Sequence, residues 1–218
     1  MYMATPKVEN KALRNYVYDH IRELIDQGII PLGEKINKNE MAKSLGISQT
    51  PINDALNQLV GERFLEQRPR SGYYVREFSS KEFCELFEMR AGLETIAVRL
   101  CCENATDEQL HTLITMFDEF SEEVADELSH HYYEVDRTFH EHIIMYSNNS
   151  FILDTLRSTG FLARTYQKGL VRGPKVTMPE HKRIIEGLKK RDSQAASQAM
   201  LDHLLGSRDV FKEKLLGK

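Results

Sequence analysis

Four polar residues in the second half of the chain have the types and spacing of metal ligands. Asp136 and His140 are four residues apart, so on a helix both side chains project from one face. His181 falls in the first turn of a helix expected over 179–190, where the helix dipole favours the neutral imidazole that binds a metal. His203 lies among apolar residues of another expected helix. Surface or core residues often show the same spacing, so both interpretations stay open.

A second candidate site lies in residues 37–75, with the sequence NKNEMAKSLGISQTPINDALNQLVGERFLEQRPRSGYYV. Ala42 is small enough for a close helix crossing, Gly46 suits a left-handed turn, and Ile52 can pack back onto the first helix. This spacing predicts a helix-turn-helix, whose second helix enters the DNA major groove.

The expected second helix carries a polar stripe beside its apolar one. Gln49, Asn53 and Asn57 recur every four residues, with Thr50 next to them. On an isolated helix this stripe would be a solvated face. On a recognition helix, an amide side chain can bond adenine N6 and N7 together, so we interpret the stripe as a DNA-reading face.

A small wing is expected directly after this helix. Residues 64–68 and 72–76 have the pattern of two strands around the turn sequence PRSG, and Gly72 opens the second strand. Arg68 and Arg70 in this hairpin can contact phosphate or the minor groove.

The rest of the pattern predicts helices. A helix is expected over 10–27, with Asn10 as its N-cap and Gly28 at its end. No strand pattern follows Arg76. The helices expected there cover 79–102, 106–128, 132–146, 151–170, 179–190 and 192–216.

These elements predict a mainly α protein in two parts. We expect residues 1–78 to form a winged helix-turn-helix DNA-binding domain. Residues 79–218 are expected to form an antiparallel bundle of six to seven helices that binds an effector and dimerises.

Composition agrees with a globular protein, at 41% hydrophobic and 28% charged residues. Residues 1–78 hold 11 Lys+Arg against 10 Asp+Glu, and the remainder hold 18 against 23, so only local patches can be basic.

Cys84, Cys101 and Cys102 lack ligand spacing, so we expect reduced thiols. No apolar run reaches the roughly 18 residues of a membrane span, and we expect a cytoplasmic protein with no membrane partner.

Residues 10–76 resemble the winged helix-turn-helix of the GntR family of bacterial transcription regulators, through the stretch MAKSLGISQTPINDALNQLVGERFLEQRPRSGYYV. The family commonly has arginine where this chain has Asn39, Gln49 and Asn53, and glutamate where it has Asp54. We therefore expect an operator richer in A·T at the recognition-helix contacts. The expected DNA contacts are Lys38, Asn39, Gln49, Thr50, Asn53, Asn57, Arg68, Arg70 and Gly72.

Residues 79–218 resemble the FCD effector domain of FadR-like GntR regulators, through LFEMRAGLE, DRTFHEHII, PEHKRII and AMLDHLL. In the metal-binding branch of that group, the matching ligands are Asp136, His140, His181 and His203. The resemblance implies a divalent ion, zinc or nickel, with open positions for the carboxylate of a small organic effector.

Two further residues match effector-facing positions of the family. Arg90 lies where the family directs an arginine toward the cavity, although it also has the spacing of an ion pair with Glu94. Asn148 follows the metal-bearing helix and is equally typical of a helix stop.

The resemblance implies a homodimeric, ligand-responsive DNA-binding regulator, a repressor rather than an activator, and not an enzyme. Its partners would be a double-stranded operator and a small carboxylate effector. Two alternatives are a metal-sensing regulator and a metalloenzyme that uses the Asp/His site. Glu141 is next to a candidate ligand but points off the ligand face, so no general base is evident.

Overall fold

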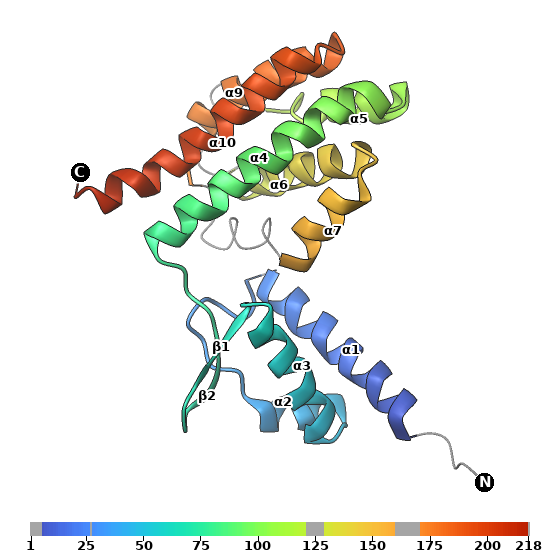
Figure 1. Ribbon diagram of the computed structural model, residues 1–218, viewed down its shortest axis with the longest axis vertical. Coiled ribbons are helices and arrows are strands. Elements are labelled where there is room, and N and C mark those ends of the chain that lie inside the picture. The colour runs from blue at the N-terminus through green and yellow to red at the C-terminus, as the bar shows by residue number, and fades with distance from the viewer. Residues whose placement is uncertain (1–5, 27, 121–128, 160–170, 218) are drawn as a thin grey trace. The chain divides into compact units, whose positions relative to one another are not determined.

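A computed structural model describes residues 6–26, 28–120, 129–159 and 171–217. The chain divides into two compact units, Met1–Glu77 and Phe78–Lys218, which we describe separately (Figure 1). Among the described helices, none is both long and apolar enough to cross a lipid bilayer.

The first unit is a winged helix-turn-helix. It contains α1 (Pro6–Asp26), α2 (Lys38–Leu45), α3 (Gln49–Gly61), β1 (Leu65–Arg68) and β2 (Gly72–Val75). The side chain of Asn37 caps α2 by accepting a hydrogen bond from the Glu40 amide, and Gly46 ends this helix at φ +66°. The expected apolar stripe of α3 is fully buried against α1 through Ile52, Ala55, Leu56 and Leu59.

The wing is a two-stranded antiparallel sheet. Leu65 pairs with Val75 and Arg68 with Gly72, close to the expected boundaries. The Ile36 amide donates to the Tyr73 carbonyl over 2.8 Å, and Lys35 forms an isolated antiparallel bridge with Tyr74, so the segment before α2 pairs briefly with β2. Backbone pairing therefore joins the start of the helix-turn-helix to its wing.

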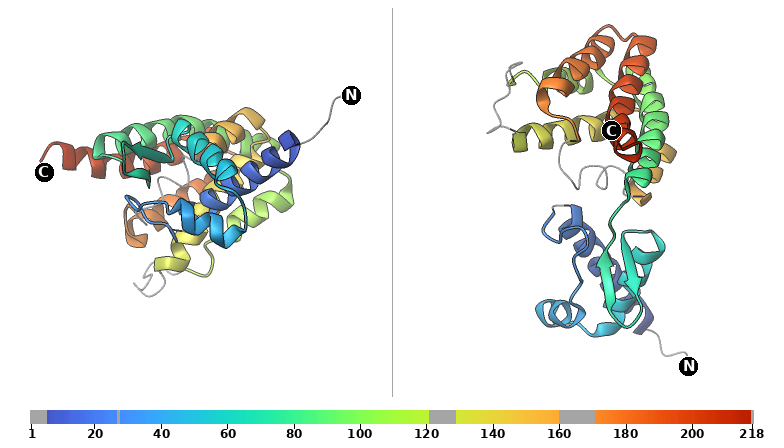
Figure 2. Two further views of the ribbon diagram at one scale, coloured as in Figure 1. Left: turned by 90° about the horizontal axis from the view of Figure 1, so that it is seen from below. Right: turned by 90° about the vertical axis from the view of Figure 1, so that its left-hand side faces the viewer.

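The second unit is a helical bundle. Its described helices are α4 (Ser80–Asn104), α5 (Asp107–Thr115), α6 (Ser129–Tyr146), α7 (Ser150–Thr159), α9 (Pro174–Lys189) and α10 (Ser193–Leu215). The long helices α4 and α10 run side by side, α6 packs against α4, and α9 packs against α10 (Figures 1 and 2). Capping boxes begin α4 at Ser79 and α5 at Thr106, as their sequences indicate. The predicted fold class is confirmed.

One helix start was predicted wrongly, with a consequence for the site. The helix expected to begin at Pro179 begins at Pro174, with Gly173 as its N-cap. Proline is favoured in a first turn, where its missing N–H is not needed, and Pro174 takes that position. His181 is therefore the eighth residue of α9, too far from the N-terminus for the helix dipole to act on it.

Two other boundaries also differ. Helix α1 begins at Pro6, so Asn10 lies inside it and is not its cap. Helix α5 ends at Thr115 rather than continuing toward residue 128, because tight turns then bury both Phe117 and Phe120. The parts of the expected helices that cover 121–128 and 160–170 lie outside the described residues.

Candidate metal centre and DNA-reading face

Three helices of the second unit bring the four candidate ligands together. Asp136 and His140 come from α6, His181 from α9 and His203 from α10. One ligand atom from each residue lies within 4.8 Å of the others, and all four side chains are buried. We call this group the Asp–His cluster.

Carboxylates orient two of the three imidazoles. Glu94 Oε2 lies 2.5 Å from His140 Nδ1, and Glu180 Oε2 lies 2.8 Å from His203 Nδ1. A carboxylate accepts hydrogen bonds, so each Nδ1 carries the proton and each Nε2 keeps its lone pair. Metal-binding histidines typically have this arrangement, in which an acceptor fixes the ring and its tautomer.

The third imidazole is held by a hydroxyl. Tyr132 Oη lies 2.9 Å from His181 Nδ1 and 2.8 Å from Thr177 Oγ1. Phe117 stacks on the His181 ring at a centroid distance of 4.6 Å. These contacts restrict rotation of the ring and leave its Nε2 to face the cluster.

The unsatisfied atoms of the cluster fit a metal ion. Nε2 of His140 and Nε2 of His181 are buried without a hydrogen-bond partner, which is costly unless another group binds them. Asp136 Oδ1 lies 3.0 Å from His181 Nε2, although not along the direction of a hydrogen bond. Three imidazole nitrogens and one carboxylate suit a borderline divalent cation.

One buried and one partly buried arginine neutralise the two orienting carboxylates. Arg90 Nε donates to Glu94 over 2.6 Å, and Arg172 donates to both oxygens of Glu180 over 2.7 Å each. Burial alone would raise the pKa of Glu94, but the charge of Arg90 and the hydrogen bond from His140 outweigh it and lower the pKa to about 2. Glu180 behaves likewise, since bonds from His203 and Arg172 overcome burial and lower its pKa to about 2. Both carboxylates are therefore ionised near neutral pH.

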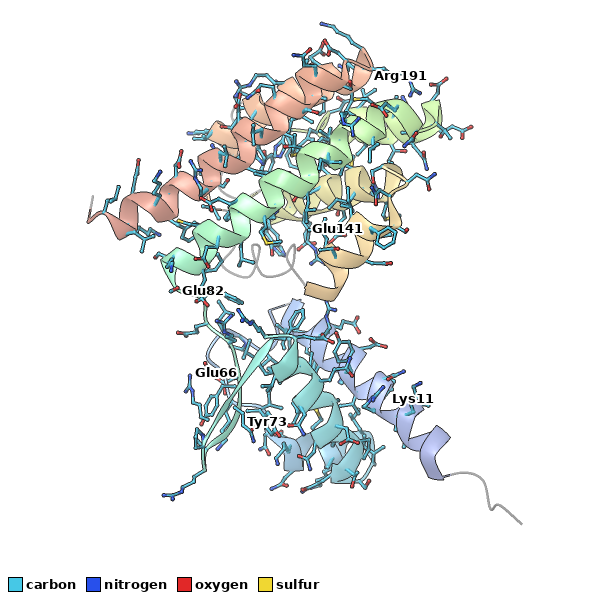
Figure 3. All side chains as sticks on the ribbon, in the orientation of Figure 1. Lys11, Glu66, Tyr73, Glu82, Glu141 and Arg191 are labelled. Atoms are coloured by element: carbon cyan, nitrogen blue, oxygen red, sulfur yellow. The ribbon has the colours of Figure 1, made fainter. Side chains whose placement is uncertain are left out.

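The other residues proposed from the sequence lie in different surroundings. Arg90 makes the buried ion pair with Glu94, which was one of its two interpretations. Asn148 is exposed and has φ +56°, a backbone conformation typical of a helix stop. Glu141, labelled in Figure 3, pairs with Arg137 over 2.9 Å.

Sequence reasoning missed the groups that orient the histidines. Glu94 was considered only as the partner of Arg90, and Tyr132, Arg172 and Glu180 received no role. The one available signal was that Glu180 is adjacent to His181 in a candidate ligand segment. The other contacts join residues on different helices, and a single sequence does not reveal them.

Acidification is expected to destabilise the protein when no metal is bound. Burial, together with nearby His181, lowers the pKa of His203 to about 3, and burial also lowers the pKa of His181. Both rings stay neutral in the folded chain where an unfolded histidine, with a pKa of about 6.5, gains a proton. This stability is complete above that pH and is lost as the pH falls toward 3. The His203 ring alone is expected to cost about 2 kcal/mol between pH 7 and 5, and His181 adds to the loss in the same direction.

Guanidinium unfolding of chelator-treated protein at pH 7 and pH 5 measures this loss. His203→Gln should reduce the pH dependence, whereas His111→Gln, at an exposed position, should not. Equal stability of the wild-type chain at both pH values would contradict the expectation.

Gly206→Ala is expected to weaken metal binding from outside the cluster. A Cβ at Gly206 would lie 2.6 Å from Arg172 Nη1, and that guanidinium is held by Glu180 and by the His203 carbonyl oxygen. Moving Arg172 would loosen the carboxylate that orients His203. Changes in such outer contacts typically cost roughly 10- to 100-fold in metal affinity, and we expect about 10-fold here.

Competition with a chromophoric chelator measures the affinity of this variant. Gly92→Ala is the matched control, because a Cβ at Gly92 on α4 meets nothing within 4 Å. Equal affinity of the Gly206 and Gly92 variants would show that Arg172 does not support the site.

The predicted reading residues lie on α2, α3 and the wing. The stripe residues Gln49, Thr50 and Asn57 are exposed, and Asn53 is half-buried. Arg68 lies at the end of β1 with its guanidinium 4.0 Å from the Tyr74 ring centroid, and Arg70 is exposed in the turn. Their contacts with DNA remain a prediction.

This combination of parts defines a class of protein. A winged helix-turn-helix reads DNA, and a separate helical bundle with a buried, unsatisfied ligand cluster can respond to a small molecule. The class is therefore a DNA-binding regulator with an effector domain.

Comparisons with known proteins give the family. Residues 13–75 match the family of bacterial regulatory proteins called the gntR family, and residues 85–206 match the FCD domain. The Nta operon transcriptional regulator of Aminobacter aminovorans is 31% identical over 188 residues, which cover 85% of this chain and 88% of that protein. The HTH-type transcriptional repressor RspR of Escherichia coli strain K12 is 22% identical over 207 residues, covering 94% and 91%.

A solved structure shows the same fold. E. coli McbR/YncC matches with a TM-score of 0.73 and 20% identity, covering 98% of this chain and 100% of that one. The chain belongs to the GntR family and carries an FCD domain. It is a ligand-responsive, DNA-binding transcription regulator, as the sequence predicted.

Proposed function

We propose that this regulator is a homodimeric repressor whose FCD domain holds a divalent metal ion and binds a small organic acid. Zinc or nickel suits the donor set of the Asp–His cluster. The observation that carries the proposal is the convergence of the three histidines, whose Nδ1 atoms are engaged elsewhere while two buried Nε2 atoms lack a partner. The proposed effector contacts remain Arg90 and Asn148.

The charges around the cluster favour an anionic ligand. Glu94 is neutralised by Arg90, and Glu180 by Arg172, so Asp136 is the carboxylate that the Asp–His cluster itself would contribute to a cation. A bound divalent cation would leave a net positive charge and supply a Lewis-acidic position for a carboxylate. Buried positive charge is costly unless an anion compensates it, which supports an organic acid as the effector.

The output of this proposal is a change in operator binding. An acid that binds two arrangements of the dimer unequally shifts the population between them. The spacing of the two recognition helices would then change relative to two symmetric half-sites. The proposal that the protein represses transcription is supported by relatives such as RspR, which is named a transcriptional repressor.

Native mass spectrometry of the purified full-length protein is the first test. We expect twice the chain mass of 25.3 kDa, with one metal ion per chain. Fluorescence anisotropy with duplexes from the gene's own upstream region should show salt-dependent binding, weakened by the right carboxylic acid. Absence of binding to every fragment at low salt would count against the proposed operator function.

Separate titrations distinguish acid sensing from metal sensing. At saturating metal, an acid sensor changes its operator affinity as acid is added. At fixed acid, a metal sensor changes its affinity as metal is added. A metalloenzyme would release product, and the outward ion pair of Glu141 with Arg137 supports a regulator over that alternative.

A further inference from the structure

One amide of the proposed reading face has its orientation imposed by a charge. Lys38 Nζ at the start of α2 lies 3.1 Å from the side-chain amide of Asn53 on α3. An ammonium group only donates hydrogen bonds, so the atom of Asn53 that faces it must be the carbonyl oxygen. The Nδ2 amino group of Asn53 is thereby left for DNA.

The position of Lys38 is supported by the wing. Its ammonium lies 5.5 Å from the ring centroid of Tyr73 on β2, within the range of a cation–π contact. Tyr73, labelled in Figure 3, is buried, and its hydroxyl donates to Asn57 Oδ1 over 2.7 Å. Residues of α2, α3 and β2 therefore hold the Lys38–Asn53 contact together.

We propose that Lys38 sets the base preference of Asn53 as a specificity-determining residue. Bidentate reading of adenine needs the amide oxygen to accept from N6 and the amide nitrogen to donate to N7. The bond from Lys38 occupies one of the two lone pairs of Oδ1 and holds this oxygen toward α2, so Nδ2 is the atom that Asn53 directs away from Lys38. A donor in that position suits the acceptors N7 and O6 of guanine or O4 of thymine. This inference rests on the proposed reading role of α3, and it replaces adenine as the base expected opposite Asn53.

A neighbouring amide pair provides an internal comparison. Gln49 Nε2 donates to Asn39 Oδ1 over 2.6 Å. In the described parts of the chain no cation is hydrogen-bonded to this pair, and exchanging the two amide orientations preserves the hydrogen bond. Gln49 can therefore adopt either amide orientation toward a base, and its base preference should not depend on Lys38.

Selection from randomised duplexes with the full-length protein tests the proposal. Asn53→Ala should lose its preference at one position in each half-site, which identifies the base that Asn53 reads. At that position the wild-type chain should select guanine or thymine, as should Lys38→Arg, which keeps a donor. Lys38→Met frees Oδ1 and should raise the selection of adenine by about fivefold or more, the range of one bidentate contact. The position read by Gln49 should stay unchanged.

Each failure has a distinct signature. If Asn53→Ala alters no position, the reading role of α3 fails. If Asn53 reads a position but Lys38→Met leaves its base unchanged, the role of Lys38 is wrong. Lys38→Met could bind too weakly for selection. In that case we would measure the affinity of the wild-type chain for four duplexes that differ only at the base read by Asn53. A preference for adenine at that position would overturn the proposal.

Discussion

His140→Ala is expected to abolish stable retention of metal by the FCD domain. The change removes one of four converging ligands and leaves the buried carboxylate of Glu94 without its imidazole. Changes in outer contacts alone typically weaken metal binding by roughly 10- to 100-fold, so the loss of a direct ligand should exceed that range. Metal analysis after gel filtration should then find none bound.

Thermal unfolding gives a second measurement of the same change. Free metal at 1,000 times its dissociation constant stabilises a folded protein by about 4 kcal/mol, and this increment should vanish in the variant. His142→Ala is the control, because it is a histidine of the same helix that packs on Tyr146 at a centroid distance of 5.2 Å and is not part of the cluster. If His140→Ala kept both its metal and its response to acid, the assigned ligand set would be wrong.

Arg90→Leu is expected to cost about 3–5 kcal/mol of unfolding free energy, the usual cost of removing one partner from a buried ion pair. Arg90 and Glu94 are 2% and 0% exposed, so the variant leaves a carboxylate inside the bundle with far less compensation. The loss of positive charge also raises the pKa of Glu94 from its lowered value. Guanidinium unfolding monitored by circular dichroism measures the cost.

The same helix supplies a matched control. Arg99 and Glu103 have the same spacing on α4, but their side chains are 49% and 48% exposed. Exposed pairs contribute about 0.3–0.5 kcal/mol in helices, so Arg99→Leu should be nearly neutral. Similar costs for the two substitutions would refute the buried role of Arg90.

The double variant Arg90→Leu/Glu94→Leu separates stability from metal binding. Removing both charges should recover much of the lost stability, because no unpaired charge remains buried. Metal affinity should stay low, since His140 Nδ1 no longer has the acceptor that orients its ring. Recovery of both properties would indicate that Glu94 does not support the site.

The helix-turn-helix was predictable because its determinants are local. Asn37 as a cap, Gly46 as a left-handed end and the buried stripe through Ile52 each depend on a few adjacent residues. The start of α9 was predicted wrongly because Pro174 and Pro179 both suit the first turn of a helix, and the helix begins at Pro174.

The sequence by itself determined the family, through its motifs, and the order of the helices, because helical spacing and capping act over a few residues. It also named the four residues of the Asp–His cluster, whose role as metal ligands is our proposal. Tertiary structure alone decided how the histidines are oriented. Glu94 reaches His140 across 46 positions of the chain, Tyr132 reaches His181 across 49, and Glu180 reaches His203 across 23. A buried imidazole takes its tautomer from whichever group packs against Nδ1, and helix packing places that group.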